Sequence, residues 1–170
     1  MSVSDEGLGK ICERWGLKLP PPPKPVGAYR LLVPSDRLVF LSGQISKNAE
    51  GQVATGTLGL NLSVEEGKQA ARCAVLQAVS LIRSEMELDK VDQILRVVGY
   101  VQSSPDFHSQ SDVMNGASEL LVEIFVEIGS HARSAVGVAS LPLNAAVELE
   151  LTLKIHFADR SPNGSLSKGA

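Results

Sequence analysis

The chain has 170 residues, of which 44% are apolar and only 4% are aromatic. This length suits one domain with a mostly aliphatic core. The 16 basic and 19 acidic residues give a formal charge of −3, and the Lys and Arg residues form no cluster, which argues against a dedicated nucleic-acid-binding protein.

Cysteine and histidine are too sparse to form a metal or disulfide framework. The two cysteines lie far apart, and the three histidines lack ligand spacing, so we expect no metal site. The N-terminus is acidic rather than basic, and no apolar run approaches the length of a membrane span, about 18 residues. The sequence therefore predicts a soluble cytoplasmic protein.

The first 19 residues predict a short helix. Ser4 and Asp5 can cap it, and its apolar positions are Leu8, Ile11, Cys12 and Trp15. The prolines at 20–23 and 25 then exclude a helix and favour a stiff, extended connector. A ligand for a proline-binding domain is the alternative interpretation of this run.

Strands and helices alternate from residue 28 onward. "AYRLLV" and "RLVFLSGQI" predict a hairpin around Pro34-Ser35-Asp36, and "QILRVVGYVQS" predicts a further strand. Ser63 and Glu66 form a capping-box pattern that opens a helix reaching about Met86. A second long helix is expected over about 109–128.

Residues 131–157 predict a final pair of strands joined at a corner over 141–144. Their alternation is apolar, yet Arg133 lies near the entrance of the first strand and Glu148 near the entrance of the second. The sequence after Phe157 has almost nothing to bury, so 20–157 should form the main domain and 158–170 a disordered tail.

The resulting ββαβαββ order predicts an α+β fold with two helices packed on one face of a mixed sheet. The expected strands over 38–41, 97–101 and 147–155 have apolar residues at positions that point to both faces of the sheet. A sheet that is apolar on both faces needs a second cover, and another copy of the chain is the simplest one. We therefore expect a symmetric oligomer with Arg133 and Glu148 near the subunit boundary.

Three segments carry a resemblance to a known family. "LSGQI", "ARSAVGVASLP" and "VELE", in this order and spacing, resemble the RidA (YjgF/YER057c/UK114) family over about residues 20–157. The segments around 25–29 and "NGASELLVEIF" are similar to the branch of this family that has an extended N-terminus. The resemblance implies a chorismate-mutase-like fold and a homotrimer whose sheets form a central barrel with clefts between subunits.

The resemblance also implies an activity and a set of site residues. The activity is hydrolysis of reactive enamine or imine intermediates, such as 2-aminoacrylate, to 2-oxo acids and ammonia, without a cofactor. Arg133 matches the arginine that binds the substrate carboxylate, and Glu148 matches the glutamate that holds the water. Tyr29, Ser42 and Gly43 match the wall of the cleft contributed by the adjoining subunit, and Ala135 stands where many relatives have a cysteine.

Elementary chemistry agrees with these roles. A planar guanidinium can bind a carboxylate bidentately, and a carboxylate is a credible general base. Arg133 and Glu148 could instead form a structural ion pair across the strands or the subunit boundary. Asn115 is interpreted as a surface or helix-start residue. His131, next to Arg133, could tune the cleft, but a solvated residue at a strand end is the favoured interpretation.

Three functions remain open. The first is an enamine/imine deaminase, and the second is a trimeric protein that binds small carboxylates without turnover. The third, a ribonuclease or translation inhibitor, is disfavoured by the acidic charge balance, because phosphate contacts need cationic side chains.

Overall fold

The computed structural model describes residues 5–156. Its main elements follow the predicted order of an N-terminal helix and then ββαβαββ. They are α1 (Asp5–Arg14), β1 (Leu32–Ser35), β2 (Leu38–Ile45), α2 (Val64–Glu85), β3 (Val91–Gln102), α3 (Gln110–Phe125), β4 (Ala132–Val138) and β5 (Val147–Ile155). The expected tail at 158–170 lies outside the described residues.

The predicted capping box opens α2. The Ser63 hydroxyl accepts a hydrogen bond from the backbone N–H of Glu66, and the Glu66 carboxylate accepts one from the Ser63 N–H. These two bonds satisfy backbone donors that the first turn of a helix leaves without partners. They fix the start of the helix at the residue that the sequence indicates.

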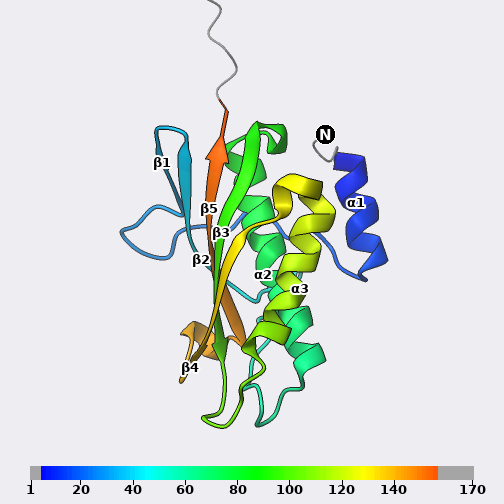
Figure 1. Ribbon diagram of the computed structural model, residues 1–170, viewed down its shortest axis with the longest axis vertical. Coiled ribbons are helices and arrows are strands. Elements are labelled where there is room, and N and C mark those ends of the chain that lie inside the picture. The colour runs from blue at the N-terminus through cyan, green and yellow to red at the C-terminus, as the bar shows by residue number, and fades with distance from the viewer. Residues whose placement is uncertain (1–4, 157–170) are drawn as a thin grey trace, which may run out of the picture.

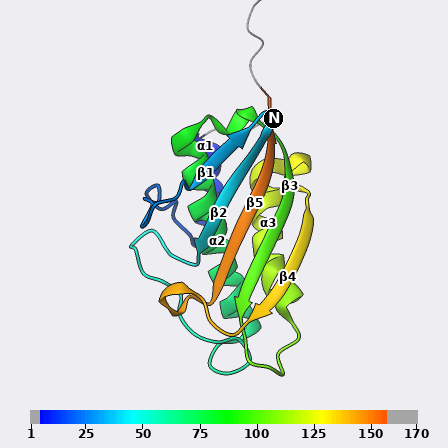
Figure 2. The same cartoon turned by 90° about the vertical axis from the view of Figure 1, so that its left-hand side faces the viewer.

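The sheet has the order β1-β2-β5-β3-β4, and α2 and α3 cover one of its faces (Figures 1 and 2). Strand β4 runs parallel to β3, whereas the other neighbouring strands are antiparallel. The expectation that β4 and β5 pair with each other is wrong, because β5 inserts between β2 and β3. Strand β4 is consequently an edge strand, joined to β3 through the crossover helix α3.

The sheet face opposite the helices is more polar than the sequence suggested. In β5 the leucines 149, 151 and 153 are buried beneath the helices, and the alternate residues Glu148, Glu150, Thr152 and Lys154 point to the other face. The expectation of apolar residues on both sides of β5 is therefore wrong. Exposed apolar side chains on this outer face come from other strands: Val33, Leu38, Phe40 and Val136.

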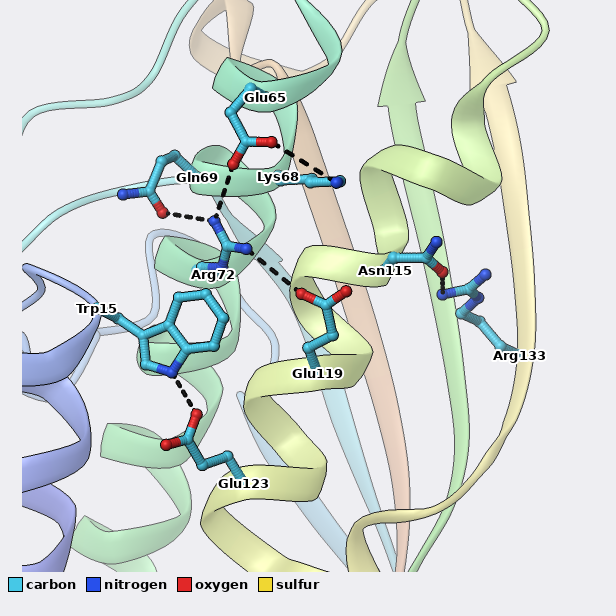
Figure 3. A network of polar contacts seen from close by, with 9 residues as sticks. All are labelled: Trp15, Glu65, Lys68, Gln69, Arg72, Asn115, Glu119, Glu123 and Arg133. Atoms are coloured by element: carbon cyan, nitrogen blue, oxygen red, sulfur yellow. Dashed lines mark hydrogen bonds and ion pairs between the residues drawn. The ribbon is translucent and has the colours of Figure 1, made fainter.

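Helix α1 packs on the helical layer rather than on the sheet. Its residues Leu8, Ile11 and Cys12 are buried. Just beyond it, the Trp15 ring stacks under the buried Arg72 guanidinium, 4.2 Å from the ring centroid, and its indole N–H donates to Glu123 of α3 (Figure 3). Cation–π stacking of this kind is strongest when the cation is desolvated. These contacts attach the N-terminal segment to α2 and α3.

Candidate functional site

The Arg133 side chain leaves β4 on the helical side of the sheet and reaches α3. Its Nη1 donates to Asn115 Oδ1 at 3.0 Å and to Ser118 Oγ at 3.0 Å. Its Nη2 donates to the backbone carbonyl of Ser111 at 3.2 Å. Figure 3 shows the guanidinium directed at Asn115 from the edge of the sheet. Three acceptors on one helix therefore hold this cation.

These acceptors are all uncharged, and this decides what else Arg133 can bind. A guanidinium carries five N–H donors, and three of them are engaged by α3. The other two N–H groups have no partner within residues 5–156, and no carboxylate there forms an ion pair with Arg133. A carboxylate accepts two parallel N–H bonds, so Arg133 retains both the charge and the donors that such a ligand needs.

Glu148 lies on the outer face of the sheet, where β5 passes a bulge in β2. The register between the two strands shifts between Leu41 and Gln44, which places Gly43 directly against the Glu148 carboxylate. A Cβ atom on Gly43 would lie 1.8 Å from Glu148 Oε1 and 2.8 Å from its carboxyl carbon. Glycine is therefore required here if Glu148 is to keep this position.

The surroundings of Glu148 favour its protonated form. Burial raises the pKa of its carboxyl group, and the negative charge of Glu150 on the same face raises it further. Tyr100 of β3 is the register partner of Glu148 in the sheet. A carboxylate with a raised pKa is a stronger base than an ordinary glutamate, which suits it to accept a proton from water.

The hydroxyl of Ser42, next to Gly43, is buried and has no hydrogen-bond partner within residues 5–156. An unpaired buried hydroxyl costs about 1–3 kcal/mol, so this position favours an added polar partner. Tyr29 is 47% exposed and belongs to the segment that leads into β1. Gly43 and Glu148 thus lie together on the outer face, Ser42 precedes Gly43 in the bulge of β2, and Tyr29 lies in the segment before β1.

Within one chain, the predicted site residues form two groups that lie on opposite faces of the sheet. Arg133 and Ala135 face the helices from the edge strand β4, and Ala135 packs against the core. Glu148 faces outward and accompanies Gly43. An ion pair between Arg133 and Glu148 across neighbouring strands is therefore excluded within one chain. The two groups can meet only if another copy supplies one of them.

The favoured interpretations of two residues beside Arg133 are wrong. Asn115 is an acceptor for the guanidinium rather than a surface residue, and both ring nitrogens of His131 are in hydrogen bonds, so it is not a solvated strand end. The alternative expectation, a role for His131 beside the cleft, stays open. The spacing of Ser111, Asn115 and Ser118, four and three residues apart, already places them on one helical face. The sequence alone does not show that β4 lies beside α3.

A cavity of about 690 Å³ lies at the end of β4 and is bordered by Phe107, Gln110 and Gly137. None of the predicted site residues lines it. Within residues 5–156, no three His, Cys, Asp or Glu side chains are arranged to hold a metal ion. No helix in the described part of the chain has the length and apolar character needed to cross a membrane.

The chain is similar to known proteins over most of its length. The family model described as Endoribonuclease L-PSP matches residues 21–155. The chain belongs to this family, the RidA (YjgF/YER057c/UK114) family. It is 43% identical over 159 residues to Protein TCP17 of Trypanosoma cruzi, covering 92% of this chain and 99% of that protein.

Two further relatives are named after an activity and after a family, respectively. A protein of Dermatophagoides farinae named 2-iminobutanoate/2-iminopropanoate deaminase is 30% identical over 137 residues, which is 79% of this chain and 91% of the relative. A RutC family protein of Aquifex aeolicus is 32% identical over 136 residues, with 79% and 94% covered. The chain thus matches these RidA relatives over nearly their whole length.

Solved structures confirm the predicted RidA-like fold class. A protein of unknown function from Agrobacterium tumefaciens has a TM-score of 0.80 and 31% identity, over 88% of this chain and 94% of that one. RidA from an Antarctic Psychrobacter has a TM-score of 0.56 and 24% identity, over 79% and 94%, and supports the fold alone.

Proposed function

We propose that this protein hydrolyses reactive enamine or imine acids, of the 2-aminoacrylate type, to 2-oxo acids and ammonia. The observation that carries the proposal is Arg133, a cation held by three uncharged acceptors with two N–H donors left for a carboxylate. The name of the Dermatophagoides relative supports the same chemistry. No cofactor is needed, because water is the second reactant, and the cytoplasm is the proposed compartment.

The proposed mechanism uses the two groups of the site together. Arg133 binds the substrate carboxylate and places the imine carbon near Glu148. An enamine first becomes the imine by gaining a proton on its terminal carbon and losing one from nitrogen. The Glu148 carboxylate accepts a proton from water as the water oxygen bonds to the imine carbon, and passes it to the imine nitrogen, which gives a tetrahedral carbinolamine. The carbinolamine hydroxyl then gives its proton to the nitrogen by way of Glu148, the carbonyl forms as the carbon–nitrogen bond breaks, and ammonia leaves with the 2-oxo acid.

We further propose a homotrimer in which each site combines two subunits. One contributes Arg133 and Ala135 from β4, and the next contributes Glu148 with Ser42, Gly43 and Tyr29. The opposite orientation of Arg133 and Glu148 within one chain supports this arrangement. Burial of apolar outer-face residues would favour association by about 25 cal/mol per Å².

We expect sedimentation at micromolar concentration to give three times the 18.0 kDa chain mass. Phe40→Glu should dissociate the assembly and abolish turnover, because Phe40 is 45% exposed on the outer face and a buried unpaired carboxylate is costly. The control is Leu60→Glu, at a loop residue that is 77% exposed. A single 18.0 kDa species for the unaltered protein would contradict the proposed trimer.

The test of the function is an assay with freshly generated 2-aminoacrylate. We expect pyruvate and ammonia to form faster than in the uncatalysed hydrolysis of the same preparation. A protein that binds pyruvate without accelerating this reaction would instead be the non-catalytic binding protein. RNA cleavage, measured in parallel, would favour the ribonuclease activity, which the formal charge of −3 disfavours.

A further inference from the structure

A chain of hydrogen bonds continues from Arg133 through Ser118 to His131. Ser118 Oγ, which accepts from Arg133 Nη1, also lies 3.0 Å from His131 Nε2. On the other side of the ring, His131 Nδ1 lies 2.6 Å from the backbone carbonyl of Gly129. These contacts link the cation of the site to the loop between α3 and β4.

The chemistry of the groups fixes the direction of each bond. A carbonyl oxygen can only accept, so the proton of a neutral ring is on Nδ1 and points to Gly129. Nε2 is then an acceptor, and the Ser118 hydroxyl must donate its hydrogen to it. The lone pairs of Ser118 Oγ consequently face Arg133, as its Nη1 donor requires.

The environment of His131 keeps its ring neutral. Burial of the ring lowers the pKa of His131, and the nearby charge of Arg133 lowers it too, although the bond to the Gly129 carbonyl acts in the opposite direction. A neutral ring can accept the Ser118 proton, whereas a protonated one cannot.

We infer that Ser118 and His131 are positioning residues that hold the Arg133 guanidinium so that its two remaining N–H groups face the substrate carboxylate. Without Ser118, Nη1 would keep only Asn115 as an acceptor and Nη2 only the Ser111 carbonyl, so the guanidinium would be held less firmly. With Ser118 held by His131, both Nη1 protons are engaged and the orientation is fixed. The inference rests on the proposed function for the identity of the ligand, and not for the immobilisation of Arg133.

The immobilisation can be measured without any substrate. In ¹⁵N spectra of arginine side chains, we expect slow guanidinium rotation for Arg133 in the trimer, with the signal assigned by its loss in Arg133→Lys. Ser118→Ala should speed this rotation at least about tenfold, because Nη1 loses one of two acceptors. Ser118→Thr retains the hydroxyl and should restore slow rotation. Ser84→Ala is the matched control, since that helical hydroxyl donates to Leu81 within α2.

Two variants of His131 separate its two bonds. His131→Gln keeps an acceptor that can reach Ser118, whereas His131→Asn can still donate to the Gly129 carbonyl and loses the contact with Ser118. We therefore expect His131→Asn, and not His131→Gln, to behave like Ser118→Ala. Equal effects of both variants would overturn the role of the Ser118–His131 bond.

Ligand measurements complete the test. In Ser118→Ala, the Kd for pyruvate and the KM for the imine acid should rise about tenfold while kcat changes less than about twofold, since a carboxylate contact acts on substrate and transition state alike. If the unaltered protein does not accelerate imine hydrolysis but the rotation and the pyruvate Kd change as expected, the proposed function fails and this inference holds. If Ser118→Ala leaves the rotation unchanged, the inference fails whatever the turnover.

Discussion

Arg133→Lys is expected to lower kcat/KM for an imine acid by about two to three orders of magnitude. Lysine keeps the charge but has one point-like ammonium in place of a planar fork, so it cannot hold the α3 acceptors and a bidentate carboxylate together. Loss of such a charged contact costs about 2–5 kcal/mol, and each 1.36 kcal/mol is a factor of about ten in rate. Steady-state kinetics with freshly generated substrate measure the effect.

Stability should stay the same, whereas loss of a structural ion pair would lower it. Arg133 has no carboxylate partner within the described residues, so neither Arg133→Lys nor Arg133→Ala leaves a buried charge unpaired there. The melting temperature and the oligomer should therefore hardly change. Arg37→Lys, in the turn between β1 and β2, is the control. A folded, trimeric Arg133→Lys with undiminished turnover would rule out carboxylate binding by Arg133.

The order of the elements could be read from the sequence because its signals are local. The capping box of Ser63 and Glu66 and the 3.6-residue periodicity of α2 depend only on neighbours along the chain. The alternation of β4 and β5 likewise identified both as strands. These patterns were sufficient to predict two helices on one face of a mixed sheet.

The neighbours of each strand could not be read in the same way. Nothing in the sequence of β5 indicates that it lies between β2 and β3, and this placement is what separates Arg133 from Glu148. The bulge that brings Gly43 against Glu148 is a tertiary feature of two strands more than 100 positions apart. The favoured interpretations of Asn115 and His131 were wrong for the same reason, since Asn115 contacts Arg133 of β4 and His131 contacts Ser118 of α3.

Glu148→Gln is expected to lower kcat by about two to four orders of magnitude, the usual contribution of a positioned general base. The amide has nearly the same shape and still fits beside Gly43, but it cannot accept a proton from water. Single-turnover hydrolysis measured for both proteins at neutral pH would show the loss. Undiminished hydrolysis by the variant would exclude Glu148 as the base.

The pH dependence of the unaltered protein follows from the raised pKa of Glu148. The base must be ionised, so activity should fall as pH decreases through this raised pKa, at a higher pH than an ordinary glutamate would give. Glu150→Gln removes the neighbouring negative charge and should shift this acidic limb to lower pH. An acidic limb that stays in place would show that another group governs it.

The effect of Glu148→Gln on stability has a definite sign. A carboxyl group whose pKa is raised by folding stabilises the fold when it is protonated, below its unfolded pKa, and this contribution is lost as pH rises through the folded pKa. At neutral pH the ionised, half-buried carboxylate therefore opposes folding, and the neutral amide removes that cost. Glu148→Gln should unfold at an equal or higher temperature than the unaltered protein while it loses its activity.

Gly43→Ala provides the matching double-mutant test. Its Cβ must displace the Glu148 carboxylate, so in the unaltered background it should lower kcat by at least about tenfold. In the Glu148→Gln background no base remains to be displaced, and Gly43→Ala should add little. Additive losses would mean that Gly43 serves the fold of β2 rather than the position of Glu148. Non-additive losses combined with undiminished stability would identify Glu148 as a group retained for chemistry at a cost to the fold.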